Sequence, residues 1–280
     1  MYPLRSRALT LAYENNNIIE GLDLNIPLHS ITVLVGSNGC GKSTLLKSFA
    51  RLLRPKQGTI LLNGKDIHQQ ATAHVAKQLS ILPQSPLVPE GLTVYQLVRM
   101  GRYPHQNWLK QWSKEDELKV NEALEQTQLL SLKDRSVDAL SGGQRQRAWI
   151  AMTLAQDTDI LLLDEPTTYL DLAHQIDILD LLFDLNKIQQ KTIVMVLHDL
   201  NLACRYADHM IAVAQKTVYA QGHPTKILDA KTVKDVFGLD CFITQDPLFG
   251  TPMCIPYGKG QQQIDLKKID LPHLSNDEEN

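Results

Sequence analysis

Residues 36–43 read Gly-Ser-Asn-Gly-Cys-Gly-Lys-Ser and follow directly on the β-branched run Ile31–Val35. Such a run is typical of a strand buried on both faces, and a helical pattern follows over 43–53. The glycines let successive backbone N–H groups turn into one concavity, and the helix N-terminus adds a partial positive charge. The pattern therefore predicts a phosphate-binding loop, in which Lys42 reaches the β- and γ-phosphates and Ser43 ligates Mg²⁺.

A second segment complements this loop. The apolar run Ile160–Leu163 ends in Asp164 and Glu165, at the strand edge where ligands of open α/β sheets bind. Asp164 would hold Mg²⁺ through water, and Glu165 would orient and polarise an attacking water. An apolar run with an acidic exit is also a common feature of ordinary strands, and the phosphate loop is what favours the functional interpretation.

Strand and helix patterns alternate along the chain, which indicates an α/β fold with a largely parallel sheet. The patterns between 93 and 155 are helical only, so a helical segment is inserted into the core. We expect strands at Leu4–Tyr13, 22–26, Ile31–Val35, 59–62, Leu79–Leu82, Ile160–Leu163, 193–197 and 210–214, and helices at 43–53, 93–100, 114–130, Gly142–Ala155, 172–188 and Leu200–Tyr206. Residues 221–257 have mixed patterns, and we expect 275–280 to be frayed.

Composition excludes several classes of protein. Among 280 residues, 28 Lys and Arg stand against 31 Asp and Glu, a formal charge of −3 that does not favour nucleic-acid binding. The four cysteines form no CxxC pair, which favours reduced thiols over disulfides or zinc. No apolar run approaches the ~20 residues that a spanning helix needs, and the N-terminus has no signal-peptide core. A role at a membrane would therefore require a partner.

Residues 140–147, Leu-Ser-Gly-Gly-Gln-Arg-Gln-Arg, resemble the signature motif of ABC-type ATPases. The resemblance covers nearly the whole chain. Tyr13 matches the aromatic residue that stacks on adenine, Gln84 the Q-loop glutamine and His198 the switch histidine, while Asp171 matches the D-loop aspartate. Each also has a plainer interpretation: Tyr13 as a strand residue, Gln84 as a loop polar group, His198 as a strand-end histidine and Asp171 as a helix cap.

The resemblance implies a P-loop ABC ATPase core with an N-terminal antiparallel β subdomain and an inserted α-helical subdomain. The ATPase domain would span 1–257, with the helical subdomain at 93–155 and a polar tail at 258–280. Its cofactors would be ATP and Mg²⁺. Catalytic roles would fall to Glu165, His198 and Gln84, metal binding to Ser43, Gln84 and Asp164, and ATP binding to Tyr13, Gly36, Ser37, Asn38, Gly39, Cys40, Gly41, Lys42, Ser43 and Thr44.

Ser141 is a good N-cap for the helix Gly142–Ala155, and the glycines after it leave backbone N–H groups bare. This is a second anion site, although the chain has one phosphate loop. The resemblance implies that two copies pair head to tail, so that each copy's signature helix meets the γ-phosphate bound by the other. Contacts to the partner's ATP would then come from Ser141, Gly142, Gly143, Gln144 and Asp171.

Segments 101–105, 167–175, 201–209 and 246–253 are similar to importers of ferric siderophores, haem and cobalamin, most of all to the ferric-siderophore members. The resemblance implies a peripheral subunit on the cytoplasmic face of the bacterial inner membrane. It would bind integral-membrane permease subunits near Gln84, act indirectly with a periplasmic substrate-binding protein, and bind no nucleic acid. In the stretch 85–112, Leu87, Val88, Tyr103, Trp108 and Trp112 suggest an interaction surface.

Other functions remain open at this stage. The nearest alternatives are an ATPase subunit for haem or cobalamin import, or an ABC ATPase that acts on DNA or ribosomes without transport. The latter class usually has coiled-coil or zinc insertions, or two ATPase halves. An exporter subunit often has a fused membrane domain, and a P-loop kinase would not need the helix after Ser141.

Overall fold

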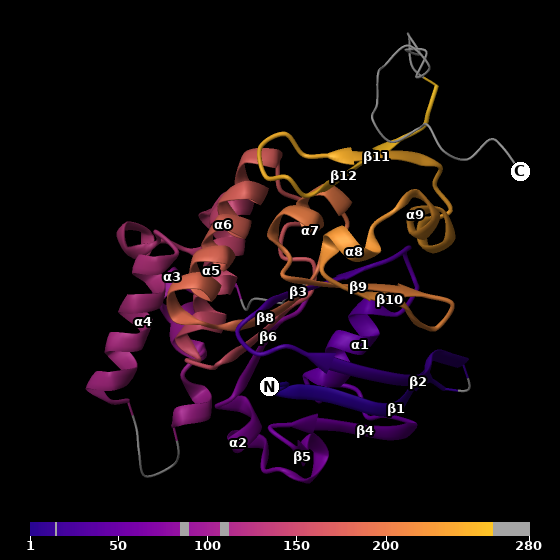
Figure 1. The fold of residues 1–280 in the computed structure, drawn as a ribbon. Helices are drawn as coiled ribbons and strands as arrows, with labels where there is room; N and C mark the ends of the chain where they lie inside the picture. Colours follow the sequence, from indigo (N-terminus) through magenta and orange to yellow (C-terminus); the bar gives the residue numbers. More distant parts are fainter. Residues whose placement is uncertain (15, 85–89, 107–111, 260–280) are drawn as a thin grey trace, which may run out of the picture.

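The computed structural model describes residues 1–14, 16–84, 90–106 and 112–259 (Figure 1). A central sheet has the strand order β10-β9-β3-β8-β7-β6, and an N-terminal antiparallel sheet has the order β2-β1-β4-β5. The central strands are β3 (Ile31–Val35), β6 (Leu79–Leu82), β7 (Ile160–Leu163), β8 (Thr192–Val196), β9 (His209–Ala214) and β10 (Thr217–Gly222). The N-terminal strands are β1 (Leu4–Tyr13), β2 (Asn16–Ile26), β4 (Gln57–Leu62) and β5 (Lys65–Asp66), and β11 (Cys241–Gln245) pairs with β12 (Pro252–Pro256).

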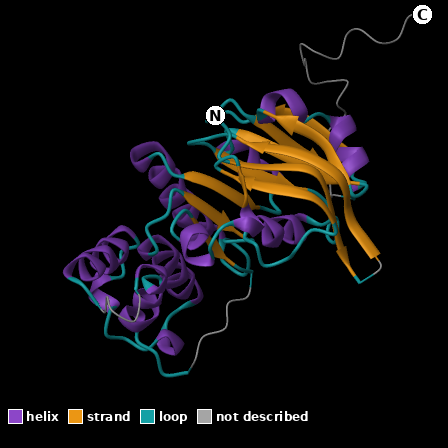
Figure 2. Cartoon of the chain, turned by 90° about the horizontal axis from the view of Figure 1, so that it is seen from below, coloured by secondary structure: helices purple, strands orange, loops and turns teal. Residues whose placement is uncertain are grey.

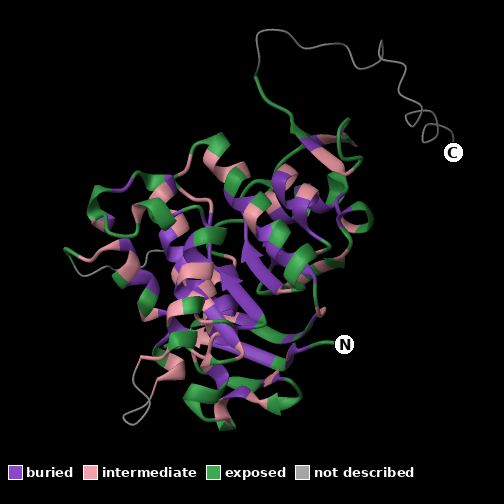
Figure 3. Cartoon of the chain, turned by 90° about the vertical axis from the view of Figure 1, so that its left-hand side faces the viewer, coloured by how far each residue is buried: buried purple, intermediate pink, exposed green. Residues whose placement is uncertain are grey.

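The parallel strands of the central sheet, β9-β3-β8-β7-β6, are covered on both faces (Figure 3). Leu34 and Leu162 face the N-terminal sheet and helix α1 (Lys42–Phe49), whereas Val33 and Leu163 face the helices on the other side. This division follows from the alternation of side chains along a strand. Burial on both faces explains why these strands read as continuous apolar runs.

The remaining helices are α2 (Thr72–Ala76), α3 (Val94–Met100), α4 (Lys114–Gln126), α5 (Gly142–Ala155), α6 (Leu172–Gln189), α7 (Leu200–Tyr206), α8 (Pro224–Ile227) and α9 (Ala230–Phe237). Helices α3, α4 and α5 pack on one another and form a cluster beside the strands (Figure 2). Capping boxes at Thr93, Ser113 and Ser141 start all three of these helices. The start of each of these three helices is therefore determined by residues close to it in the sequence.

A buried ion pair ties the helical subdomain together. Nε of Arg102 donates to Asp116 Oδ1 at 2.8 Å, and the two side chains are only 2% and 3% exposed. A further N–H of the guanidinium donates to the backbone carbonyl of Ala155 at 2.8 Å. Arg102 thus links the segment after α3 to the start of α4 and the end of α5.

The predicted fold class is confirmed, including the antiparallel N-terminal subdomain and the inserted helices. The helix expected at 43–53 ends at Phe49, because Arg51 has a left-handed φ of 64°. The helix expected at 114–130 ends at Gln126, where the Thr127 hydroxyl bonds back to the Ala123 carbonyl. Strands β5 and β10 and helix α2 were not predicted, and most of 221–257 folds into β10, α8, α9, β11 and β12.

No helix in the described ranges combines the length and the apolar character needed to span a bilayer. Residues 260–280, most of the predicted tail, lie outside the described residues.

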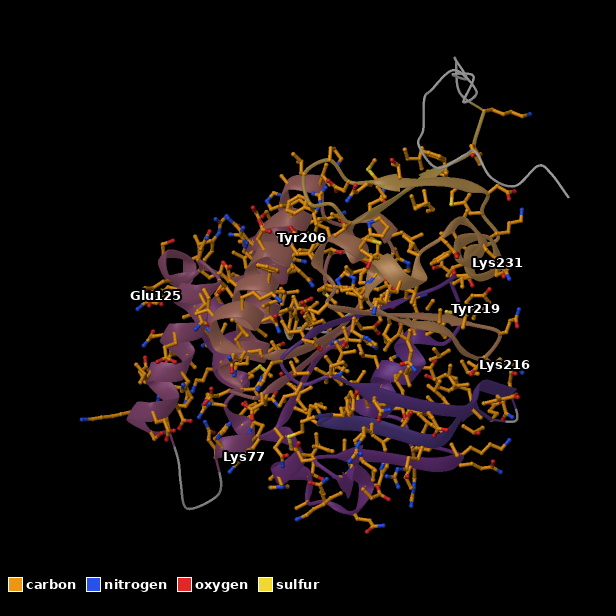
Figure 4. All side chains as sticks on the ribbon, viewed as in Figure 1. Lys77, Glu125, Tyr206, Lys216, Tyr219 and Lys231 are labelled. Atoms are coloured by element: carbon orange, nitrogen blue, oxygen red, sulfur yellow. The ribbon has the colours of Figure 1, made fainter. Side chains whose placement is uncertain are left out.

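We predict that Arg102→Ala lowers the free energy of unfolding by about 3–5 kcal/mol, because it leaves a buried, unpaired Asp116 carboxylate. Urea unfolding of the full chain measures this change. The control is Lys216→Ala, which removes the exposed pair with Glu20 at the turn between β9 and β10 (Figure 4). That change should leave the free energy of unfolding nearly unchanged, because solvent screens an exposed ion pair. Equal losses in the two variants would contradict a special role for the buried pair.

Candidate nucleotide-binding site

Four adjacent parallel strands of the central sheet end at the same edge, and each is followed by predicted site residues. The phosphate loop follows β3, His198 follows β8, Asp164 and Glu165 follow β7, and Gln84 follows β6. Neighbouring strands lie only ~4.8 Å apart, so side chains at their ends are within reach of one another. The topology therefore brings together residues that are far apart in the sequence.

The phosphate loop wraps around the ammonium group of Lys42. Lys42 is 5% exposed, and its Nζ donates to the carbonyls of Gly36 at 2.8 Å and Ser37 at 2.9 Å. Gly41 precedes α1 with φ of 107°, and a Cβ there would lie 2.9 Å from Ile18 Cγ2, so this position requires glycine. Gly41 also has no side chain with which to cap the helix. The first N–H groups of α1 thus stay available to an anion beside a buried cation.

Ser43 and Asp164 join the loop to the end of β7. The Ser43 hydroxyl donates to Asp164 Oδ1 at 2.7 Å, whereas no group in the described part of the chain bonds to the buried Oδ2 atom of Asp164. Burial raises the pKa of Asp164 above its usual value, and the adjacent Glu165 carboxylate acts in the same direction. An unpartnered buried carboxylate oxygen beside a hydroxyl is a donor set that fits a hard cation such as Mg²⁺.

Three side chains hold the Glu165 carboxylate. Nε2 of His198 lies 2.7 Å from Oε1, and Oε2 accepts from Gln84 Nε2 at 2.7 Å and from the Thr168 hydroxyl at 3.0 Å. Burial acts to raise the pKa of Glu165, but the hydrogen bonds led by that of His198 outweigh it, so the pKa lies below its usual value. Glu165 therefore stays ionised at neutral pH and acts as an acceptor.

Most of these groups line one pocket of about 430 Å³, whereas Asp164 and Thr168 lie behind the lining and bond to Ser43 and Glu165, which are part of it. The lining consists of Ile18, Asn38, Gly39, Gly41, Lys42, Ser43, Thr44, Gln84, Glu165 and His198. Tyr13 is not part of this lining and lies half exposed at the end of β1. Its stacking role stays a prediction, as do the roles of the other predicted site residues.

Sequence reasoning missed Ile18 and Thr168 at this site. Ile18 reaches the pocket from β2, which pairs antiparallel with β1 at the edge of the N-terminal sheet. Thr168 bonds to Glu165 because the chain turns sharply after β7, where Glu165 has a left-handed φ of 54°. A single polar residue three positions after an acid carries no sequence signal of its own, and neither does one apolar residue in a strand.

The remaining predicted residues lie outside this pocket. Ser141 caps α5 in a reciprocal pair with Gln144, and Gly142 and Gly143 form the first turn. Asp171 caps α6 by accepting from the backbone N–H of His174 at 2.9 Å. Each of these residues thus has a local structural role, which leaves open the further roles that were predicted for them.

The predicted interaction surface in 85–112 is described only in part. Leu87, Val88 and Trp108 lie outside the described residues. Tyr103 is exposed, as expected. Trp112, however, packs partly against the core, donates to Glu117 at 3.1 Å and lies under the Arg99 guanidinium. Trp112 is therefore only partly exposed, because its ring covers the C-terminal end of α3 and the first turn of α4. The interaction surface stays a prediction.

Comparison with known proteins gave consistent matches. A family model described as ABC transporter matches residues 19–168. The achromobactin transport ATP-binding protein CbrD of Dickeya dadantii is 64% identical, covering 94% of this chain and 98% of that protein. The ferric enterobactin transport ATP-binding protein FepC of Escherichia coli is 49% identical, covering 91% and 94%. A solved ABC transporter, described as of metal-chelate type and inward-facing, aligns with a TM-score of 0.80 at 30% identity, over 92% of this chain and 99% of that chain.

We predict that Lys42→Ala weakens ATP binding by about 10- to 100-fold, the worth of one hydrogen bond to a charged group. Titration of the purified chain with ATP by calorimetry measures the affinity. The control is Lys65→Ala, because Lys65 is exposed on β5 and does not line the pocket. An unchanged affinity in the Lys42 variant would refute the assignment of this loop to phosphate.

We predict that a maleimide inhibits ATP hydrolysis by reacting with Cys40, and that bound ATP protects the enzyme. Cys40 is partly exposed within the loop, whereas the other three thiols are buried. Burial raises the pKa of Cys204 and of Cys254 to about 12, so little reactive thiolate forms there. Mass spectrometry locates the label. Inhibition that persists in Cys40→Ala would contradict this prediction.

Proposed function

This chain belongs to the ATP-binding family of ABC transporters, and from that premise we propose that it hydrolyses ATP to drive import of a ferric siderophore through a separate permease. One observation carries the ATPase part of the proposal. Lys42, Ser43 with Asp164 bonded behind it, and Glu165 with its donors Gln84 and His198 meet at one pocket after four adjacent strands. This is the set of groups that phosphoryl transfer to water requires.

In the proposed site, the phosphates of ATP lie against the loop 36–44 and the N-terminus of α1. Lys42 would exchange its two carbonyl partners for phosphate oxygens, which are stronger acceptors because they are charged. Tyr13 would stack on the adenine from the end of β1. Its half-exposed ring is available for such a contact.

Mg²⁺ would be held by Ser43, Asp164 and Gln84. The unpartnered Oδ2 atom of Asp164 supports this assignment. Gln84 Oε1 is also available, because the amide nitrogen is the atom that bonds to Glu165. Once bound, the ion would supply positive charge that offsets charge developing on the phosphate oxygens.

Glu165 would orient and deprotonate the attacking water. Its lowered pKa keeps it in the acceptor form, and Oε1, which has one donor where Oε2 has two, retains a lone pair that can accept from water. His198 donates through Nε2, because a carboxylate only accepts. The Nε2–H group of His198 would then donate to a γ-phosphate oxygen when Glu165 turns to the water.

Two copies would be needed for a complete site. The pocket contains none of Ser141, Gly142, Gly143, Gln144 and Asp171, although the first turn of α5 presents N–H groups suited to an anion. A head-to-tail pair would place each α5 N-terminus on the ATP of the other copy. ATP would stabilise this pair through contacts that only the closed state makes.

The transport part of the proposal rests on likeness to relatives whose names specify achromobactin and ferric enterobactin transport. The chain would bind permease subunits at the cytoplasmic face of the inner membrane, near Gln84 and the exposed Tyr103. A periplasmic binding protein would deliver the chelate to that permease. Deletion of the gene should abolish uptake of a ferric siderophore by iron-starved cells; loss of haem or cobalamin uptake instead, or co-purification with ribosomes, would contradict the proposal.

We predict that Glu165→Gln lowers ATP turnover by about 10²–10⁴-fold, the contribution of a positioned base. ATP binding should persist, and an ATP-dependent dimer should accumulate, measured by size-exclusion chromatography with light scattering. The control is Glu125→Gln, an exposed residue on the outer side of α4 (Figure 4). A Glu165 variant that stays monomeric in ATP and turns over normally would refute both the base and the dimer.

A further inference from the structure

The imidazole of His174 fills the space beside the second residue of the signature helix. A Cβ atom built on Gly143 would lie 2.3 Å from His174 Cδ2 and 2.9 Å from Cγ. Real Cβ atoms do not approach other atoms this closely. The ring of a residue in the first turn of α6 thus rests directly on the backbone of the first turn of α5.

The other side of the same ring contacts Asp171. His174 Nδ1 lies 2.6 Å from Asp171 Oδ1, which also accepts from the backbone N–H of His174 at 2.9 Å. These two hydrogen bonds, the backbone one foremost, hold the pKa of Asp171 below its usual value. Because an ionised carboxylate only accepts, Nδ1 carries a proton and donates it. The hydrogen bond to Asp171 therefore orients the ring, and the ring occupies the space beside Gly143.

One neighbouring contact places this loop beside the start of α5, and one hydrogen bond within the loop holds its shape. A Cβ on Gly142 would lie 3.9 Å from Leu170 Cδ2, and the Gln175 amide donates to the Leu170 carbonyl at 2.8 Å. The segment from Leu170 to Gln175 thus runs across the start of the signature helix. His174 is the residue that touches both the acid of this segment and the glycine of the helix.

Stability alone does not account for this arrangement. The side chains of His174 and Asp171 are 43% and 68% exposed, and an ion pair this exposed contributes little to folding because solvent screens it. The contact with Gly143 is different in kind, because it sets a distance between two rigid helix starts. A displacement of about 1 Å at a reacting group can cost up to 100-fold in rate.

We propose that His174 is a positioning residue that holds Asp171 and the first turn of α5 at a fixed spacing, so that both meet the partner copy's nucleotide as one unit. This inference rests on the proposed function, in which these two elements face the second copy. It also gives Gly143 a second reason to be glycine. Besides leaving N–H groups bare, Gly143 leaves room for the imidazole ring.

A double-mutant cycle on the full chain with Mg²⁺ and ATP tests the proposal. We expect His174→Ala and Gly143→Ala each to lower kcat by about 10-fold, with the KM for ATP changed less than about twofold because neither residue lines the pocket. The double variant should lose far less than the product of the two, since the Cβ at position 143 has room once the ring is gone. Additive losses would overturn the proposal.

His174→Asn keeps both contacts on a shorter side chain. Asparagine has an N–H donor at the position of Nδ1, and its Oδ1 atom stands where the ring has Cδ2, the atom nearest to a Cβ on Gly143. We therefore expect it to recover part of the activity lost in His174→Ala, and to tolerate Gly143→Ala no better than histidine does. The matched control is His223→Ala, another exposed histidine at a helix start, which should change kcat less than about twofold. Identical activities of the asparagine and alanine variants would refute the Asp171 contact.

Failure of this inference and failure of the proposed function give different results. In the Glu165→Gln background, His174→Ala should raise the ATP concentration at half-maximal dimerisation by about 10-fold. If the Glu165→Gln parent forms the dimer and His174→Ala leaves its ATP dependence unchanged, only the positioning role is refuted. If the parent forms no dimer with ATP, the proposed function and the positioning role fail together. Thermal unfolding of each variant separates a loss of folded protein from a loss of coupling.

Discussion

Parallel pairing of strands that are buried on both faces is the constraint on which the rest of the structure depends. Because β3, β8, β7 and β6 run side by side, four chain segments must emerge at one edge of the sheet. Their exits supply the phosphate loop, His198, the acids after β7 and Gln84. The hydrogen bond between Ser43 and Asp164 spans 121 positions of sequence, and it exists only because β3 and β7 lie on either side of β8.

Two charged groups of the site, Lys42 and Glu165, have hydrogen-bond partners that stabilise their charges. Lys42 is buried but bonded to two carbonyls, and Glu165 is kept ionised by three donors. Asp164 differs, since its burial raises the pKa and one of its oxygens has no partner among the described residues. A cation would relieve that cost, which links nucleotide and metal binding to the electrostatics of the fold.

Strongly patterned elements could be predicted from the sequence, and weakly patterned ones could not. The apolar runs of β3 and β7 and the cap of α5 identify themselves through burial on both faces and through a local hydrogen bond. Strand β10 alternates exposed and half-buried residues on the sheet edge, and β11 and β12 are short and held by contacts with α7 and α9. Thr168 and His174 escaped prediction because their partners are set by turns that the local pattern does not specify.

By itself, the amino-acid sequence determined the phosphate loop, the acidic end of β7 and the capped start of α5, since these depend on glycines, one apolar run and a single capping hydroxyl. Tertiary structure decided which of these features meet. It placed Gln84 and His198 on Glu165 and set the ring of His174 on Gly143. The physical reason is that hydrogen bonds and steric contacts act over a few ångströms in space, whereas a local sequence pattern describes only neighbours along the chain. Residues far apart in the sequence come within that distance only when the strands and helices pack.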